Sequence, residues 1–200
     1  MTPAPLLLVA AVGTALGILL GRFAPRLWLG VTLGAALAAL AAAGSVLAGG
    51  AAWDWRSSFS LGGQPLHLQL DGLSAFFMAL LCVIGGTGAW YGSRYWTGAE
   101  HPNSARAGRM WWSVLLLSLG NVLLTANGLH FLIAWEIFAI SAYFLITLNR
   151  QQSEVRAAGW LYLVASHAAT LALFAFFASL AAQTGSWELG PMKDHPELTP

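Results

Sequence analysis

Long apolar runs separated by short polar segments dominate the chain up to about position 182. A helix needs about 20 apolar residues to cross a hydrocarbon core of about 30 Å. Runs of this kind predict transmembrane helices at 5–21, 27–49, 72–92, 110–127, 128–149 and 157–182. The expected fold class is therefore an all-α polytopic membrane protein with about six transmembrane helices. The first run lacks the basic residues that precede the apolar part of a signal peptide, so we expect a retained helix.

The polar segments divide the chain into four expected regions. Residues 1–70 should hold two helices and an outer loop, and residues 71–109 a third helix followed by a cytoplasmic loop. Residues 110–182 carry the remaining helices, and residues 183–200 form a polar tail or loop with three prolines. Apolar and polar side chains alternate between Leu66 and Leu70, which predicts a short β-segment at the membrane interface.

Basic residues are distributed unevenly between the two sets of loops that six helices would create. One set carries Arg22, Arg26, Arg94, Arg106, Arg109, Arg150 and Arg156. The other carries Arg56 and Lys193. Because basic residues are enriched in cytoplasmic loops, the first set should face the cytoplasm. Both termini should then lie outside, on the periplasmic side of an inner (cell) membrane.

The composition of the chain mainly excludes other classes of protein and of site. Hydrophobic residues make up 58% of the chain, charged residues only 8%, and the mean hydropathy is +0.67. A soluble domain carries about 25% charged residues, so this chain cannot cover a globule in water. The net charge is +1 without a basic stripe, which argues against a nucleic-acid partner. Cys82 is the single cysteine, which excludes an internal disulfide framework and a cysteine-rich metal or iron–sulfur site.

Glu136 is the one formally charged residue within the six apolar runs. An unpaired carboxylate inside a membrane costs several kcal/mol, so such a residue indicates a functional site. It should lie about 12 Å below the outer end of its helix. Helix spacing places Tyr143 on the same face, so its hydroxyl could hydrogen-bond near the same path. The alternative is a neutral glutamic acid that only holds helices together.

His167 is the second candidate for a proton path, because imidazole gains and loses a proton near neutral pH. It should reach nearly the depth of Glu136 on the following helix. The alternative is a structural histidine, hydrogen-bonded to a backbone carbonyl or to Ser166. His130 lies near the outer end of the Glu136 helix, where we expect water to reach it.

Other motifs have mainly structural interpretations. Asp71 stands at the start of the third run and should cap its helix. Gly85, Gly86 and Gly88 should allow close helix packing rather than bind a ligand. P-loop, dinucleotide-binding, zinc and nucleophile-elbow motifs are absent from the sequence. We therefore expect no cofactor, no metal and no catalytic residue in this chain, with any redox chemistry on another subunit.

Several short motifs resemble those of the antiporter-like proton-translocating subunits. These are DGLSAFF at 71–77, Trp135-Glu136 and SAYFLI at 141–146. Such subunits occur in NADH:quinone oxidoreductase, in Mrp-type cation/proton antiporters and in membrane-bound hydrogenases. The segments 159–162 and 166–168 are most similar to the hydrogenase-4 and formate hydrogenlyase branch of this family.

The resemblance implies a membrane subunit that contributes to proton or sodium translocation, coupled to electron transfer on partner subunits. It makes residues 110–182 the first part of the proton-translocating helix repeat. It also implies that Glu136 pairs with a lysine on a seventh helix, which the present sequence does not include. The implied partners are the lipid bilayer, other membrane subunits and peripheral hydrogenase or dehydrogenase subunits.

Other interpretations stay open at the level of sequence. The chain could be a non-catalytic membrane anchor or assembly element, or an Mrp-type cation/proton antiporter subunit without a redox partner. Its length fits either a truncated or split gene product or a short subunit that docks beside a complete antiporter-like protein.

Overall fold

Six long helices and one β-hairpin make up the computed structural model, which describes residues 2–190. The helices are α1 (Pro3–Phe23), α2 (Pro25–Leu47), α3 (Gly72–Tyr95), α4 (Ala105–Leu124), α5 (Gly128–Ile146) and α6 (Ser153–Thr184). The strands are β1 (Trp53–Leu61) and β2 (Gln64–Leu70). Each of the six helices is long and apolar enough to cross a membrane. The expected class of polytopic helical membrane protein is thus confirmed, with a hairpin added.

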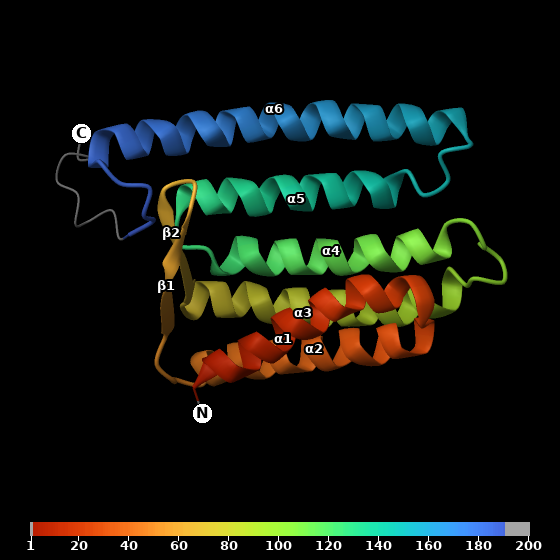
Figure 1. The fold of residues 1–200 in the computed structure, drawn as a ribbon, viewed down its shortest axis with the longest axis horizontal. Coiled ribbons are helices and arrows are strands. Elements are labelled where there is room, and N and C mark those ends of the chain that lie inside the picture. Colours follow the sequence, from red (N-terminus) through yellow and green to blue (C-terminus); the bar gives the residue numbers. More distant parts are fainter. Residues whose placement is uncertain (1, 191–200) are drawn as a thin grey trace.

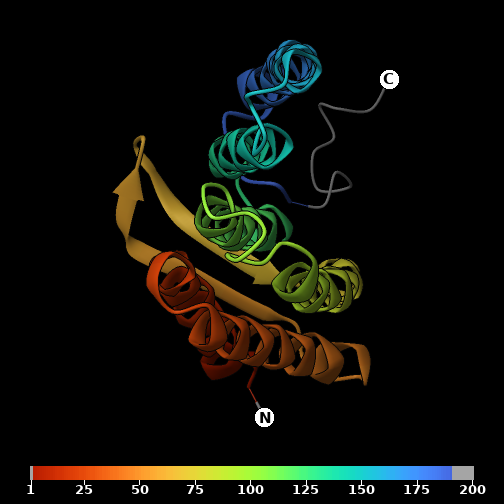
Figure 2. The ribbon, with the colours of Figure 1, turned by 90° about the vertical axis from the view of Figure 1, so that its right-hand side faces the viewer.

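The helices run side by side, with their ends at two opposite sides of the molecule (Figure 1). We call the side that carries β1 and β2 the hairpin side. The opposite side carries the turn at Ala24 and the loops 96–104 and 147–152, and we call it the arginine side. Figure 2 shows α1, α2, α3 and α4 as one group, with α5 and then α6 stacked beyond α4. The helix that carries Glu136 therefore lies between the four-helix group and α6.

Local sequence signals explain where several helices begin and end. The Asp71 side chain accepts a hydrogen bond from the Ser74 N–H at 2.7 Å, so its expected capping role is confirmed. Asn127 caps α5 in the same way, accepting from the N–H groups of Leu129 and His130. These side chains satisfy backbone donors that the first helical turn leaves without intrahelical partners.

Two helices begin four or five residues before the runs that predicted them. Helix α4 begins at Ala105 rather than near residue 110, and α6 begins at Ser153 rather than near residue 157. Apolar runs mark only the part of a helix that lies in hydrocarbon. Charged side chains such as Arg109 continue the helix toward water, because their long stems can reach the interface. Of the expected polar tail, residues 191–200 lie outside the described part of the chain.

The segment between α2 and α3 forms an antiparallel hairpin, longer than the expected β-segment. Trp53 pairs with Leu70 at its open end, and Leu61 pairs with Gln64 beside the turn. Gly62 and Gly63 form that turn at φ values of 63° and 79°, a region that glycine adopts without strain. The register shifts between Arg56 and Ser60. The alternation noted at Leu66–Leu70 predicted only β2, and β1 is added by the structure.

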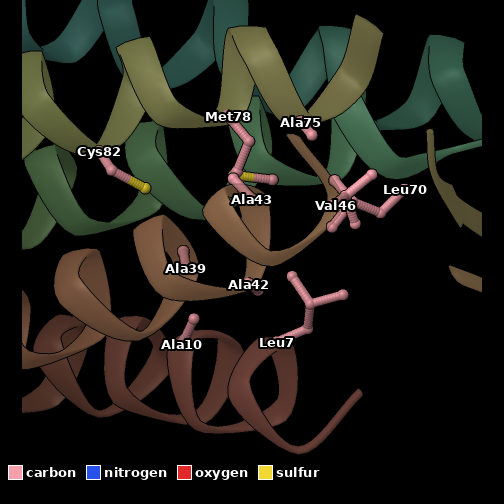
Figure 3. Close-up of a cluster of buried hydrophobic side chains, with 10 residues drawn as sticks. All are labelled: Leu7, Ala10, Ala39, Ala42, Ala43, Val46, Leu70, Ala75, Met78 and Cys82. Carbon is pink, nitrogen blue, oxygen red and sulfur yellow. The ribbon is translucent and has the colours of Figure 1, made fainter. Parts of the chain in front are cut away.

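Small residues bring α1, α2 and α3 close together in the main buried cluster (Figure 3). Ala42, Ala43 and Ala75 have no exposed surface, and Leu70 closes the cluster at the hairpin side. Helices in lipid gain from such close contact because small side chains let their backbones approach. A Cβ atom at Gly85 would lie 2.5 Å from Leu116, so the expected packing role of this glycine is confirmed.

Candidate functional site

Helices α5 and α6 bring Glu136 and His167 together. The distance from Glu136 Oε2 to His167 Nε2 is 3.6 Å, although 31 positions separate the two residues in the chain. Glu136 is eight residues from the start of α5, which places it about 12 Å from the hairpin side. The predicted agreement in depth between the two side chains is confirmed.

The hydrogen bonds of the pair restrict where a proton can reside. His167 Nδ1 lies 2.9 Å from the backbone carbonyl oxygen of Leu163, so this nitrogen donates its hydrogen to that oxygen. In a neutral ring the other nitrogen, Nε2, is then a proton acceptor that faces the carboxyl group of Glu136. A single proton can be held either on the carboxyl or on the imidazole. His167 therefore makes the backbone hydrogen bond expected of a structural histidine, and it also faces a partner with which it can exchange a proton.

The second oxygen of the Glu136 carboxyl group has no partner among the described residues. Glu136 Oε1 is buried and makes no hydrogen bond there. The Glu136 side chain as a whole is 30% exposed, and that of His167 is 50% exposed, on helices that lie in the membrane. A buried carboxyl oxygen normally has a hydrogen-bond partner, so Glu136 has capacity for a further polar contact.

Tyr143 lies on α5 two turns beyond Glu136, toward the arginine side. The rise of a helix separates the two residues by about 10 Å along the axis, too far for direct hydrogen bonding. Its ring contacts Phe144, with centroids 5.3 Å apart, and faces α6 near Gly159. A role for Tyr143 in the proton path stays a prediction that requires water or another group to bridge this gap.

Glycine residues set the separation of α5 and α6 on either side of the pair. A Cβ atom at Gly159 would lie 2.3 Å from Thr147 Cγ2 and 3.2 Å from Tyr143 Cε2. Near the hairpin side, a Cβ atom at Gly128 would lie 2.9 Å from the ring of Phe177. Both glycines are therefore required by close approach, and the Glu136–His167 contact lies between them.

We expect Gly159→Ala to destabilise the protein because the new methyl group overlaps Thr147. Forcing extra volume into a packed site typically costs about 1–3 kcal/mol, more than alanine gains in helix propensity. Gly34→Ala in α2 is the matched control, because nothing lies within 4 Å of its Cβ position. Thermal unfolding of the chain in lipid nanodiscs should show a lower midpoint for Gly159→Ala alone. Equal midpoints for the two variants would contradict the close packing.

The structure corrects the expectation that water reaches His130. This residue is only 4% exposed, and its Nε2 lies 3.1 Å from the carbonyl oxygen of Leu61 at the end of β1. The hairpin covers the start of α5, which the sequence pattern did not reveal. His130 lines a cavity of about 240 Å³ between α4 and α5, together with Asn121 and Thr125.

Sequence analysis missed a polar cluster on the hairpin side. His67 of β2 contacts Asp54 of β1 and Glu188, which follows α6. No local pattern signals this cluster, because His67 and Glu188 are 121 positions apart. Within residues 2–190, no group of three or more His, Cys, Asp or Glu side chains is arranged to hold a metal ion.

Comparisons with known proteins find similarity in the helical fold and in the segment that contains Glu136 and His167. Residues 125–195 match the family model described as NADH:quinone oxidoreductase/Mrp antiporter, transmembrane. This match covers α5, α6 and therefore both Glu136 and His167.

Curated relatives extend the similarity over more of the chain. Hydrogenase-4 component B of Escherichia coli (strain K12) is 23% identical over 128 residues, which are 64% of this chain and 19% of that protein. An uncharacterized protein of Mycobacterium tuberculosis (strain ATCC 25618 / H37Rv) is 32% identical over 124 residues, 60% of this chain and 18% of that protein. The chain thus spans about a fifth of the length of these relatives.

Among solved structures, the fold resembles a chain of the membrane-bound sulfane sulfur reductase, an archaeal respiratory membrane complex. The TM-score is 0.67 at 21% identity, over 92% of this chain and 28% of that chain. At this identity the likeness shows the fold alone. The fold is that of a multi-pass membrane protein, and residues 125–195 are similar to the antiporter-like transmembrane family. The resemblance to the antiporter-like subunits of NADH:quinone oxidoreductase, Mrp antiporters and hydrogenases is confirmed.

Proposed function

We propose that the chain moves protons or sodium ions across a membrane as part of a larger redox-driven complex. The observation that carries this proposal is the Glu136–His167 pair, a carboxyl group and an imidazole 3.6 Å apart in the middle of two membrane-spanning helices. Both groups can bind and release a proton, and they lie close enough together to exchange one. Such a pair can accept a proton from one side and pass it on.

The position of the pair supports a function within an assembly of membrane helices. Helix α6 is the least buried of the six helices. Only 6% of its most apolar stretch is buried within the described structure. Ionisable groups in membranes normally face a bundle interior or a water-filled cavity. The half-exposed His167 and the unpartnered Glu136 Oε1 therefore favour further membrane helices beside α5 and α6. Peripheral hydrogenase or dehydrogenase subunits would supply the electron transfer.

Ion movement in inside-out membrane vesicles tests this proposal. Vesicles that contain the chain in its native complex receive either an electron donor, such as hydrogen or NADH, or an imposed sodium gradient without a donor. Proton uptake that requires the donor and disappears when the chain is deleted supports a redox-driven role. Uptake driven by the sodium gradient alone favours the Mrp-type antiporter. A third outcome is that deleting the chain removes the complex, while every Glu136 and His167 variant that assembles pumps normally. This outcome favours a non-catalytic membrane anchor.

We infer that the arginine side faces the cytoplasm and the hairpin side the periplasm. The asymmetry of basic residues supports this orientation, because seven of the nine Lys and Arg residues lie in the loops of the arginine side or in the helix turns next to them. A topology reporter fused after Arg150 should give a cytoplasmic signal, and one fused after Gly190 a periplasmic signal. If both fusions report the same side, the proposed orientation is wrong.

A further inference from the structure

A nearly enclosed histidine joins two carboxyl groups on the hairpin side. The side chain of His67 is 8% exposed, and its Nε2 lies 2.7 Å from Asp54 Oδ2. Its Nδ1 makes a short contact with Glu188 Oε2. Arg56 is paired with the same Glu188 oxygen at 3.1 Å, and the amide nitrogen of Asn127 lies 3.4 Å from Glu188 Oε1. We call these five side chains the His67 cluster.

The contacts of His67 require one proton more than a neutral ring carries. A neutral imidazole has a single N–H donor, whereas two carboxyl oxygens lie at hydrogen-bond distance from its two nitrogens. Two ionised carboxylates and one guanidinium leave the cluster with a single net negative charge. One added proton neutralises that charge and supplies the missing hydrogen bond. A ring that carries this proton donates one N–H to each of the two carboxylates.

The cluster links parts of the molecule that are distant in sequence. Asp54, Arg56 and His67 belong to the hairpin, Asn127 caps α5, and Glu188 follows α6. Backbone hydrogen bonds accompany these contacts. The Ala126 N–H donates to the His67 carbonyl, the Gly128 N–H to the Trp187 carbonyl, and the Leu189 N–H to the Ala126 carbonyl. The hairpin is thereby joined to the ends of the two helices that carry Glu136 and His167.

We propose that the His67 cluster is a proton-binding site at the surface, separate from the Glu136–His167 pair, and that its bound proton holds the hairpin against α5 and the segment after α6. The half-exposed Asp54, whose side chain is 55% exposed, gives water access to the site. When the proton leaves for water, one carboxylate faces an unprotonated nitrogen and its hydrogen bond is lost. Loss of a partly buried hydrogen bond between charged groups weakens the contact it supported. This proposal does not depend on the function proposed above.

Solid-state NMR of ¹⁵N-histidine in the full chain, reconstituted in lipid bilayers, measures the proton directly. The resonance lost in His67→Gln identifies His67. In the wild type it should show both ring nitrogens protonated at low pH, with one proton lost as the pH rises. Asp54→Asn removes one of the two carboxylates that the ring contacts, so the doubly protonated ring should be lost at lower pH than in the wild type. A ring with one protonated nitrogen throughout, or a midpoint unchanged by Asp54→Asn, would overturn the proposal.

Hydrogen–deuterium exchange at the amides of Ala126, Gly128 and Leu189 measures the closure of the hairpin. Comparing wild type with His67→Gln at the same pH cancels the intrinsic pH dependence of exchange. Protection should be roughly tenfold greater in the wild type at about pH 5 and similar in both at about pH 9. His101→Gln on the arginine side is the matched control and should behave as wild type. Equal protection of wild type and His67→Gln at both pH values would show that the proton does not hold the hairpin.

Discussion

Replacing Glu136 by glutamine is expected to remove most ion translocation while the complex still assembles. Glutamine preserves the shape of the side chain but cannot bind and release a proton. Proton transfer by a positioned side chain typically contributes a factor of about 100 or more, so we expect a loss of at least about tenfold in pumping rate. Glu136→Asp keeps the carboxyl group but withdraws it from His167, and it should retain partial activity. The measurement is proton uptake in vesicles, normalised to complex content by immunoblot.

Glu154→Gln is the matched control for this experiment. It makes the same chemical change in the first turn of α6, where the side chain is exposed near the arginine side. It should pump at the wild-type rate. If Glu136 only holds helices together, Glu136→Gln would be nearly neutral and Glu136→Ala would fail through loss of assembly. Full pumping by Glu136→Gln would remove Glu136 from the mechanism.

His167→Gln is expected to reduce translocation by about tenfold, because it removes the proton acceptor that faces Glu136. Glutamine can still donate a hydrogen bond toward the Leu163 carbonyl, so the structural contact of His167 is largely preserved. The same vesicle assay applies, with His101→Gln as the matched change in a loop on the arginine side. A wild-type rate for His167→Gln would restrict this residue to its backbone contact.

The double variant distinguishes a pair from two independent groups. If Glu136 and His167 exchange one proton as a unit, Glu136→Gln with His167→Gln should pump no more slowly than Glu136→Gln alone. If the double variant instead loses pumping rate by the product of the two single losses, the two residues contribute separately on separate paths. This comparison tests the 3.6 Å contact itself rather than the presence of either side chain.

Hydrophobic patterning determined the six spans and identified Glu136 as the one formally charged residue within them. The signal is strong because lipid leaves a helix few alternatives, since every backbone polar group in the membrane must be satisfied within the segment. Counting residues along α5 and α6 was enough to place Glu136 and His167 at a similar depth. The same counting placed Tyr143 on the Glu136 face, but a shared face does not bring two groups into contact when about 10 Å of helix separates them.

Other features depended on contacts between distant segments. The burial of His130 follows from the hairpin lying over the start of α5. The need for Gly159 arises only because Thr147, just beyond the neighbouring helix α5, occupies the space of its Cβ atom. None of these partners is close enough in the chain to leave a periodic signal.

The sequence alone therefore determined which segments cross the membrane and which carboxyl group lies within it, because the cost of transferring charge and backbone into hydrocarbon acts on each segment separately. Only the tertiary structure decided which groups meet. Helix rotation brought His167 Nε2 to Glu136, and the closing of the hairpin onto the segment after α6 brought His67 to Glu188. Rotation and docking depend on the packing of side chains from several segments at once, which no single stretch of sequence specifies.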